Sequence, residues 1–521
     1  MEYVKALNFT AGRGEGRMKF FILGLYFAVL IVIGFYSLKK SRDVGGFFLG
    51  NRTVGPWISA FAYGTTYFSA VIFIGYAGKV GWGFGLSDLW IVIGNAFIGC
   101  FLAWKVLARP TREMTVRLNA MTMPEFLAAR YDSPALRTVG ALLIFIFLVP
   151  YSASVYMGLS YLFEQVFQID FATALIIMAA LTAVYLVLGG YIAVTLTDFI
   201  QGLIMIGGVF ILIYYVITAP PIGGLVTGIS RLAAINPRLV SPVGPNWFAL
   251  LSLVILTSLG PWGLPQMVQK FYAIKDERSI WPATVVSTLF ALIIATGAYF
   301  TGAFGRLFFN NQMPLLNGQP NPDLIMPQII NQYLPSWVGL LLLLLVLAAS
   351  MSTLASLVLV SSSAVAIDLV QGSVPHVSRR TVMALLRFLC AFFIGLSVYI
   401  ALKPTIILVL MSLSWGTVAG AFLAPYLYGL YWPRTTKAGA WAGLLSGLII
   451  SLGLAFYYHL DGSVIPTIGS LAMIIPLGVV PLVSLVTPAF SREHLARVFG
   501  PGRVSTATTK GLVTDDLGFG K

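Results

Sequence analysis

Apolar stretches of membrane-spanning length occupy most of this chain. A helix needs about 20 consecutive apolar residues to cross the hydrocarbon core of a bilayer, and the sequence contains thirteen such stretches joined by short connections. Only 10% of the residues are charged and 58% are hydrophobic, which excludes both a soluble globular protein and a disordered chain. We therefore predict an all-α polytopic membrane protein. The stretches lie at about 19–38, 54–77, 89–108, 137–166, 171–190, 198–217, 246–269, 280–305, 335–367, 381–402, 405–432, 437–459 and 465–488.

The distribution of Lys and Arg predicts how the chain is oriented. In a soluble protein the formal net charge of +14 would suggest a nucleic-acid partner, but in a membrane protein basic residues gather in cytoplasmic connections. One alternating set of connections, which includes the C-terminus, holds 23 of the 32 basic residues, whereas the opposite set holds five and the N-terminal tail four. All of them fall in a loop, in a tail or at a helix end. We predict a cell-membrane protein with its N-terminus outside and its C-terminus in the cytoplasm, in contact with the lipid bilayer and with neither a nucleic acid nor an obligatory protein partner.

The N-terminal tail conflicts with this orientation because its basic residues would lie outside. Residues 11–17 read AGRGEGR, which is what a purine-rich ribosome-binding sequence gives when it is translated. We expect translation to start at Met18 rather than at Met1, and mass spectrometry of the mature N-terminus distinguishes the two starts.

Two of the stretches contain helix-breaking residues at mid-depth. The second reads GTTYFSA over 64–70, and the seventh reads GPWGLP over 260–265. Such interruptions are tolerated in a membrane where the helix lines a cavity or is buried in protein. Five stretches separate the starts of these two, so they cross the membrane in opposite directions, as an inverted repeat requires. We expect a substrate cavity at the breaks, although two kinked packing helices would give the same pattern.

The ninth stretch carries a cluster of neutral oxygens. Ala349, Ser352 and Thr353 are spaced i, i+3, i+4 and share one helix face. Hard cations take oxygen ligands, so this face, completed by carbonyls freed at the break in the second stretch, could hold Na⁺. The alternative is that the hydroxyls bond to carbonyls of their own helix. Asp198, at the start of the sixth stretch, is either a helix N-cap or an acid that draws the ion along its exit path.

Enzymatic chemistry has little support in the sequence. The stretches contain no cluster of His, Cys and carboxylates that could hold zinc, and no Ser/His/Asp set shares a depth. We therefore predict a protein that is not an enzyme and has no organic cofactor.

Four motifs give a resemblance that covers nearly the whole chain. They are GGYIAVTLTDFIQ at 189–201, TMPEFLAARY at 122–131, ASMST at 349–353 and GLYW at 429–432. With these motifs the chain resembles the sodium/solute symporter family. The resemblance implies a leucine-transporter-like core of two inverted five-helix repeats, with one extra helix before it and two after it. The implied division is 1–53 for an N-terminal tail, the extra helix and a basic cytoplasmic loop, 54–217 for the first repeat, 218–245 for an extracellular loop, 246–432 for the second repeat, 433–488 for two additional helices and 489–521 for a cytoplasmic tail.

The resemblance also implies a sodium site. Asp198 matches the aspartate that the family carries near that site, and Na⁺ is the implied coupling ion. The implied ligands are the carbonyl oxygens of Thr65, Phe68 and Ala349 and the hydroxyls of Ser352 and Thr353.

Departures from the family's patterns narrow the substrate. Sugar-transporting relatives carry a Glu-Gln pair where this chain has Val71 and Ile72, which disfavours sugars. Proline-transporting relatives have an aspartate where Tyr67 stands, and Trp and Tyr where Thr257 and Pro261 stand, which puts proline in doubt. The TYFSA run at 66–70 and the break at 263–265 look more like pantothenate transporters, and monocarboxylate transporters also fit.

We therefore predict a secondary active transporter that couples inward Na⁺ flux to the uptake of a small organic solute by alternating access. The solute would be an organic acid such as pantothenate or a monocarboxylate, or an amino acid such as proline, with pantothenate tested first. A proton-coupled carrier that uses Asp198 and, less favoured, a channel are the alternatives. The candidate substrate contacts are Tyr67, Ser69, Thr257, Trp262 and Gln266.

Overall fold

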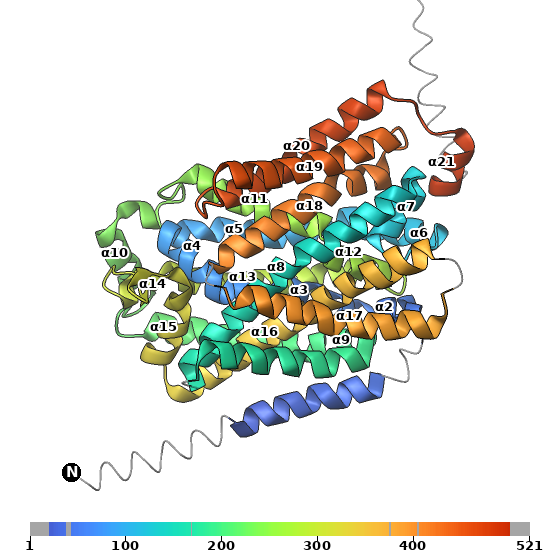
Figure 1. The fold of residues 1–521 in the computed structure, drawn as a ribbon. Coiled ribbons are helices and arrows are strands. Elements are labelled where there is room, and N and C mark those ends of the chain that lie inside the picture. The colour runs from blue at the N-terminus through green and yellow to red at the C-terminus, as the bar shows by residue number, and fades with distance from the viewer. Residues whose placement is uncertain (1–19, 38–42, 168, 375–376, 404–405, 501–521) are drawn as a thin grey trace, which may run out of the picture.

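The structure is a computed structural model that describes residues 20–37, 43–167, 169–374, 377–403 and 406–500, with the backbone alone at 185–189 and 379. The two predicted translation starts, Met1 and Met18, and the last 21 residues lie outside the described residues. Helices dominate what is described, and one short antiparallel strand pair joins β1 (Leu315–Leu316) to β2 (Gln319–Pro320). The chain is thus a helical bundle (Figure 1), as the apolar stretches predict.

The first predicted repeat contains one broken helical segment and three long ones, the last of which is interrupted. Its break follows α3, and its longest helix, α9, is interrupted at Gly190, whose φ of 58° lies in the left-handed region. A Cβ there would lie 2.8 Å from the Phe47 ring, so only glycine fits this turn between the fifth and sixth stretches. The segments are α3 (Pro56–Tyr67), η2 with α4 (Val71–Tyr76, Ala77–Phe84), α5 through α6 (Leu89–Gly94 to Arg109–Arg117), α8 (Pro134–Phe167) and α9 (Phe171–Thr218).

The second predicted repeat also begins with a broken helix. Helices α11 and α12 meet at Leu264 and are bent by 45°. Two further helices, α19 (Lys437–Tyr457) and α20 (Ile465–Val486), follow this repeat and pack beside α18 (Figure 1). The segments of the repeat are α11 (Trp247–Gly263), α12 (Pro265–Ala273), α13 (Ile280–Ala303), α16 with η9 (Ser336–Ser363, Ala364–Gln371), α17 (Arg379–Ala401) and α18 (Ile407–Tyr431).

By length and composition, ten described helices could cross a membrane, or eleven if the bent pair α11 and α12 is one span. This number is smaller than the thirteen apolar stretches because helix breaks regroup them. The second stretch is divided after Tyr67, its second half continues into the third stretch, and the fifth is a shorter apolar helix over Phe171–Val184. The apolar runs were therefore recognised correctly, but their division into continuous helices depends on the breaks.

Helix α16 lies at the centre of the bundle and the first helix lies at its edge. The most apolar window of α16 is 83% buried, compared with 28% for the helix Phe20–Ser37. Figure 1 shows that first helix, in blue, along the outside of the bundle beside α9. A helix that is apolar all round and almost fully buried is surrounded by protein rather than lipid, which makes α16 a suitable place for polar side chains.

Basic connections that were predicted to share one side of the membrane contact one another. Helices α6, α7 (Met123–Tyr131) and α21 (Arg492–Phe499) gather at one end of the bundle, whereas α10 (Leu225–Ile235), α14 (Gly305–Phe308) and α15 (Ile325–Tyr333) lie at the other (Figure 1). We call these the α7 end and the α10 end. At the α7 end, Arg112 donates to the Ile274 carbonyl at 3.0 Å and Arg117 donates to the Val498 carbonyl at 2.9 Å.

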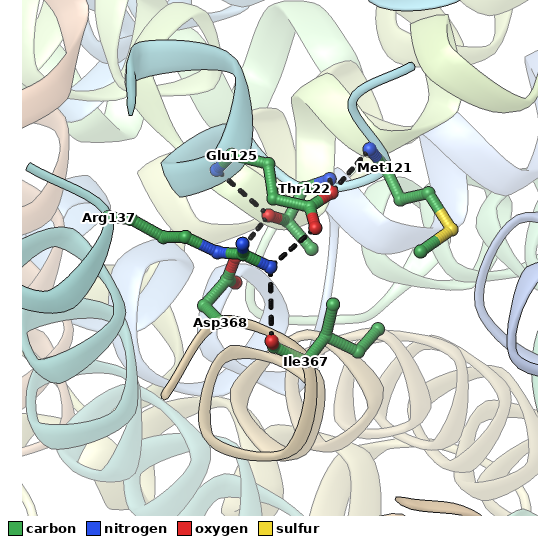
Figure 2. A network of polar contacts seen from close by, with 6 residues as sticks. All are labelled: Met121, Thr122, Glu125, Arg137, Ile367 and Asp368. Carbon is green, nitrogen blue, oxygen red and sulfur yellow. Dashed lines mark hydrogen bonds and ion pairs between the residues drawn. The ribbon is translucent and has the colours of Figure 1, made fainter. Parts of the chain in front are cut away.

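A polar network fixes the α7 end to the central helix. Arg137, at the start of α8, forms ion pairs with Glu125 at 2.5 Å and with Asp368 at 3.1 Å (Figure 2). The Thr122 hydroxyl donates to Asp368 at 2.7 Å, and Thr122 and Glu125 form a capping box at the start of α7. Because Asp368 belongs to η9, the network connects α7 and α8 to the continuation of α16.

Candidate functional site

The break in the second stretch exposes backbone oxygen inside the protein. The last backbone bond of α3 runs from the Phe68 amide to the Gly64 carbonyl at 3.2 Å, and Phe68 itself is extended, with φ −110° and ψ 109°. The Thr65 carbonyl is therefore the first one that the break leaves without a helical N–H donor. The next segment restarts where the Val71 amide donates to Ser69 Oγ at 3.2 Å.

Close packing holds this break in place. A Cβ at Gly64 would lie 2.3 Å from the ring of Phe290, so α3 approaches α13 so closely that a larger residue would require the Phe290 ring to shift. The break is thus positioned by the core of the bundle rather than by a flexible loop.

Two hydroxyls of α16 meet the freed carbonyl. Ser352 Oγ lies 3.1 Å from the Thr65 carbonyl oxygen, and Thr353 Oγ1 lies at the same distance from it. Thr353 Oγ1 is also 3.1 Å from the Ala349 carbonyl, and Ser352 Oγ is 3.0 Å from that same oxygen. All four residues are 0% exposed. The structure thus brings together four of the five residues predicted to hold Na⁺, and the fifth, Phe68, lies at the break itself.

Acceptors outnumber donors in this cluster. The same hydroxyls also approach the carbonyls of Ala348 at 3.0 Å and Thr66 at 3.3 Å, so two hydroxyl protons face four carbonyl oxygens. Bonding within the helix, the alternative interpretation, does occur, but it accounts for only part of the geometry. A hydroxyl donates one proton at a time, so the cluster is rich in oxygen lone pairs that a cation could satisfy.

The spacing of the oxygens suits a small hard cation. Oxygen ligands at about 2.3–2.6 Å from such an ion lie about 3.4 Å apart when they are at right angles. The contacts of 3.1 Å from Ser352 and Thr353 to the Thr65 carbonyl are slightly shorter. An ion would therefore replace the hydroxyl-to-carbonyl hydrogen bonds and need only a small separation of α3 and α16.

Asp198 is placed deeper than the sequence suggested. The helix that contains it begins at Gly190, so Asp198 lies two turns inside that helix and does not cap it. Its side chain is 0% exposed, and among the described residues neither carboxylate oxygen has a hydrogen-bond partner. The N-cap interpretation is therefore wrong, and an unpartnered buried carboxylate remains.

Lys270 corrects the expectation that basic residues lie only in loops, in tails and at helix ends. The connection expected over 270–279 begins instead as helix, because α12 continues to Ala273 and all nine of its residues are buried. Lys270 is 0% exposed, and its Nζ donates to Ser356 Oγ at 3.0 Å. A hydropathy criterion ends a stretch at a charged residue, so the sequence could not indicate that this lysine points into the bundle.

A small cavity lies where the two broken helices approach each other. Its volume of about 20 Å³ is enough for a water molecule. Six of its lining residues are aromatic, and none carries a charged side chain. The lining residues are Tyr67, Phe68, Ser69, Val71, Ile72, Tyr76, Asn95, Tyr151, Thr257, Tyr299, Met411 and Trp415.

The predicted substrate contacts divide into two groups. Tyr67, Ser69 and Thr257 line the cavity, and the Tyr67 hydroxyl donates to the Thr257 carbonyl at 2.7 Å, which joins the two broken helices. The indole of Trp262 donates to the Ile98 carbonyl at 3.0 Å, away from the cavity lining. Gln266 is buried at the start of α12 but does not line the cavity.

Comparison with known proteins identifies the family. A sequence model of the sodium:solute symporter family matches residues 47–447. The chain belongs to this family. The symporter is 30% identical over 444 residues to the osmoregulated proline transporter OpuE of Bacillus subtilis, covering 83% of this chain and 89% of that protein. It is 29% identical over 459 residues to the sodium/proline symporter of Escherichia coli, covering 85% and 90% respectively.

The fold agrees with a solved structure of a transporter. A Na⁺-coupled sialic acid symporter in a substrate-bound, outward-open state superposes with a TM-score of 0.76 and 19% identity, covering 91% of this chain and 98% of that one. The symporter therefore has the all-α, leucine-transporter-like architecture of two inverted five-helix repeats, and it is a multi-span, sodium-coupled solute transporter.

Sequence reasoning missed most of the cavity walls of this symporter. Trp415 of α18 stacks on Tyr67 with ring centroids 6.0 Å apart and meets Tyr151 of α8 edge-on at 5.8 Å. Tyr151 follows Pro150 inside an apolar stretch, and Asn95 is an amide inside another. Those two features were the available signals, whereas nothing in the sequence distinguishes Trp415 from a packing residue.

Proposed function

We propose that this symporter binds Na⁺ between the broken helix α3 and the central helix α16, and that this ion drives solute uptake by alternating access. The proposed ligands are the carbonyls of Thr65, Phe68 and Ala349 and the hydroxyls of Ser352 and Thr353. The observation that carries the proposal is the excess of carbonyl acceptors over hydroxyl donors at the break. An ion bound there joins two repeats of opposite orientation, so its affinity depends on how the repeats are arranged.

We further propose that the α7 end faces the cytoplasm. The basic connections meet at this end, and the positive-inside rule assigns such connections to the cytoplasm. In the described structure α12 is fully buried at this end, so the path from the ion site to the cytoplasm is closed. Release of Na⁺ and solute then requires α12 to move.

The chemistry of the cavity lining, rather than the present volume of the cavity, supports a solute with one carboxylate and a compact apolar body. The aromatic side chains of Tyr67, Tyr151 and Trp415 favour an apolar body, and no lining side chain is charged. The helix that starts at Val71 presents its N-terminal end at the break, where the helix dipole favours a carboxylate. Proline, pantothenate and monocarboxylates all have this chemistry, and the names of the relatives add weight to proline.

The energy available from Na⁺ entry distinguishes these candidate substrates by how far each could be accumulated. A membrane potential of about 100 mV provides about 2.3 kcal/mol per charge, and a tenfold Na⁺ gradient adds about 1.4 kcal/mol. One Na⁺ could therefore concentrate a zwitterion such as proline about several-hundredfold. A monoanion such as pantothenate moves no net charge with one Na⁺ and would be concentrated only about tenfold.

The test is uptake of labelled proline, pantothenate and lactate into proteoliposomes. External Na⁺ is replaced by K⁺ at constant pH, with an inside-negative potential imposed in both cases. We expect uptake of one of the three solutes to require Na⁺. Uptake that is unchanged without Na⁺ but follows a proton gradient would contradict sodium coupling and favour the alternative in which Asp198 carries a proton.

A pair of serine variants makes this test specific. Ser352→Ala removes a proposed ligand, whereas Ser350→Ala removes a buried hydroxyl whose bond goes to the Val346 carbonyl of its own helix at 2.6 Å. We expect only Ser352→Ala to reduce the apparent affinity for Na⁺. Equal loss in both variants would show that the effect is general damage to α16.

A further inference from the structure

A buried lysine lies one helical turn from the proposed sodium ligands. The Lys270 Nζ donates to Ser356 Oγ at 3.0 Å, and Ser356 follows Thr353 by three residues on α16. Ser356 Oγ is also 3.0 Å from the Thr66 hydroxyl, and the Thr66 carbonyl lies 3.3 Å from Thr353 Oγ1. Hydrogen bonds through Ser356 and through the hydroxyl and carbonyl of Thr66 therefore connect the proposed sodium site to the ammonium group.

Lys270 also contacts α9, the helix that carries the buried aspartate. The ammonium lies 5.1 Å from the centre of the Tyr191 ring, and Asp198 follows Tyr191 by seven residues, which is two turns along the same face of α9. The Tyr26 hydroxyl from the first helix and Gln201 lie on the Asp198 side and hydrogen-bond to each other at 2.8 Å. A buried carboxylate needs a nearby positive charge, and Lys270 supplies it.

These contacts come from three parts of the transporter that must move relative to one another. Lys270 is on α12, the second half of a broken helix, whereas Ser356 is on the central helix and Asp198 is on α9. The ammonium thus closes the contact between a broken helix and the two long helices at the point where an ion would leave the site toward the α7 end.

We propose that the Lys270 ammonium has two roles. It occupies the exit of the proposed sodium site, and it neutralises Asp198 in place of a second Na⁺. Its charge keeps Asp198 from binding a transported cation, so a single Na⁺ moves with each solute. Na⁺ leaves when α12 separates Lys270 from Ser356. Lys270 is a positioning residue that acts through Ser356 and Asp198, and the inference rests on the proposed sodium coupling.

The test measures the charge moved per solute in proteoliposomes, by reversal potential at constant pH, for Lys270→Met. Without the ammonium, Asp198 requires a cation from solution, so we expect the charge moved per solute to rise by about one elementary charge. Lys275→Met is the matched control, since Lys275 lies five residues further along and its side chain is exposed. Lys270→Arg keeps the charge and should keep the wild-type ratio. A wild-type ratio in Lys270→Met would overturn the proposal.

A double variant covers the case in which Lys270→Met does not fold. Removing one member of a buried charge pair leaves the other uncompensated, so Lys270→Met/Asp198→Asn should recover both the yield of folded protein and the wild-type ratio. Failure to recover either would overturn the proposal. A wild-type protein whose uptake ignores Na⁺ would instead contradict the sodium coupling, so the two failures are distinguishable.

Discussion

The two broken helices share a sequence pattern but present different groups to the interior. At the break after α3, the Thr65 carbonyl meets the hydroxyls of α16 at 3.1 Å. At the break after α11, a Cβ on Gly263 would lie 2.7 Å from the Ala419 carbonyl oxygen, so this break is packed against the backbone of α18. The first break exposes oxygens that can bind an ion, whereas the second allows close packing and carries a fixed ammonium on Lys270. The groups that pack against a helix break, rather than the break itself, therefore determine whether it can bind an ion.

The largest effect is expected when the first break loses a ligand. Thr353→Ala removes the hydroxyl that contacts Thr65 and Ala349, and a hydrogen bond to a charged group contributes about 1.5–3 kcal/mol, which corresponds to a loss of Na⁺ affinity of about 10- to 100-fold. Thr353→Ser retains the hydroxyl and should restore most of it. Na⁺ activation curves of solute uptake check both variants. A Thr353→Ala curve that superposes on that of the wild type would show that the oxygens at the first helix break do not bind the ion.

Glycine substitutions compare the packing of the two breaks. Gly263→Ala would bring a Cβ against backbone, which cannot rotate away, whereas Gly64→Ala would meet the Phe290 side chain, which can shift. Overpacking costs about 1–3 kcal/mol, and we expect Gly263→Ala to lie at the upper end and Gly64→Ala at the lower. Thermal unfolding in detergent measures the order, and a larger loss for Gly64→Ala would reverse our view of which break depends on close packing.

Removing the hydrogen bond between the two broken helices should have a smaller effect on transport. Tyr67→Phe removes the hydroxyl that donates to the Thr257 carbonyl at 2.7 Å, at a cost of about 0.5–1.5 kcal/mol. Because this bond closes the cavity, we expect the substrate concentration for half-maximal uptake to change about two- to tenfold while Na⁺ activation stays near that of the wild type. A change in Na⁺ activation as large as that of Thr353→Ala would show that the two regions are not separate.

The smallest effect on transport is expected at the α10 end, where a buried carboxyl affects the pH dependence of stability instead. Asp323 accepts from the Ile407 amide at 3.0 Å, and burial raises the pKa of its carboxyl to about 6. An acid whose pKa is raised on folding binds its proton more tightly in the folded state, so stability falls as the pH rises from about 4 to about 6 and then levels off. Asp323→Asn should flatten that part of the stability profile. A decline as steep as in the wild type would assign the pH dependence to other groups.

The sequence predicts the oxygen cluster of the proposed sodium site better than it predicts the cavity, for physical reasons. Ala349, Ser352 and Thr353 are related by helical periodicity, so their shared face can be predicted from spacing alone. Trp415, Tyr151 and Asn95 come from three different helices, and their meeting depends on how the bundle packs.

The positions of two buried charged residues could not be predicted from the sequence either. Lys270 resembles the end of a helix in a hydropathy reading, and Asp198 resembles its beginning. The structure places both inside the bundle, where Lys270 contacts Ser356 of α16 and Tyr191 of α9, the helix that carries Asp198. Pairing between distant segments cannot be seen in the composition of either segment.

Equilibrium binding of radioactive ²²Na⁺ to the purified symporter tests the central claim, which is that neutral oxygens at the first break bind the coupling ion. We expect saturable binding in the wild type and in Ser350→Ala, and its loss in Ser352→Ala/Thr353→Ala. Saturable binding of equal affinity in that double variant would contradict the account.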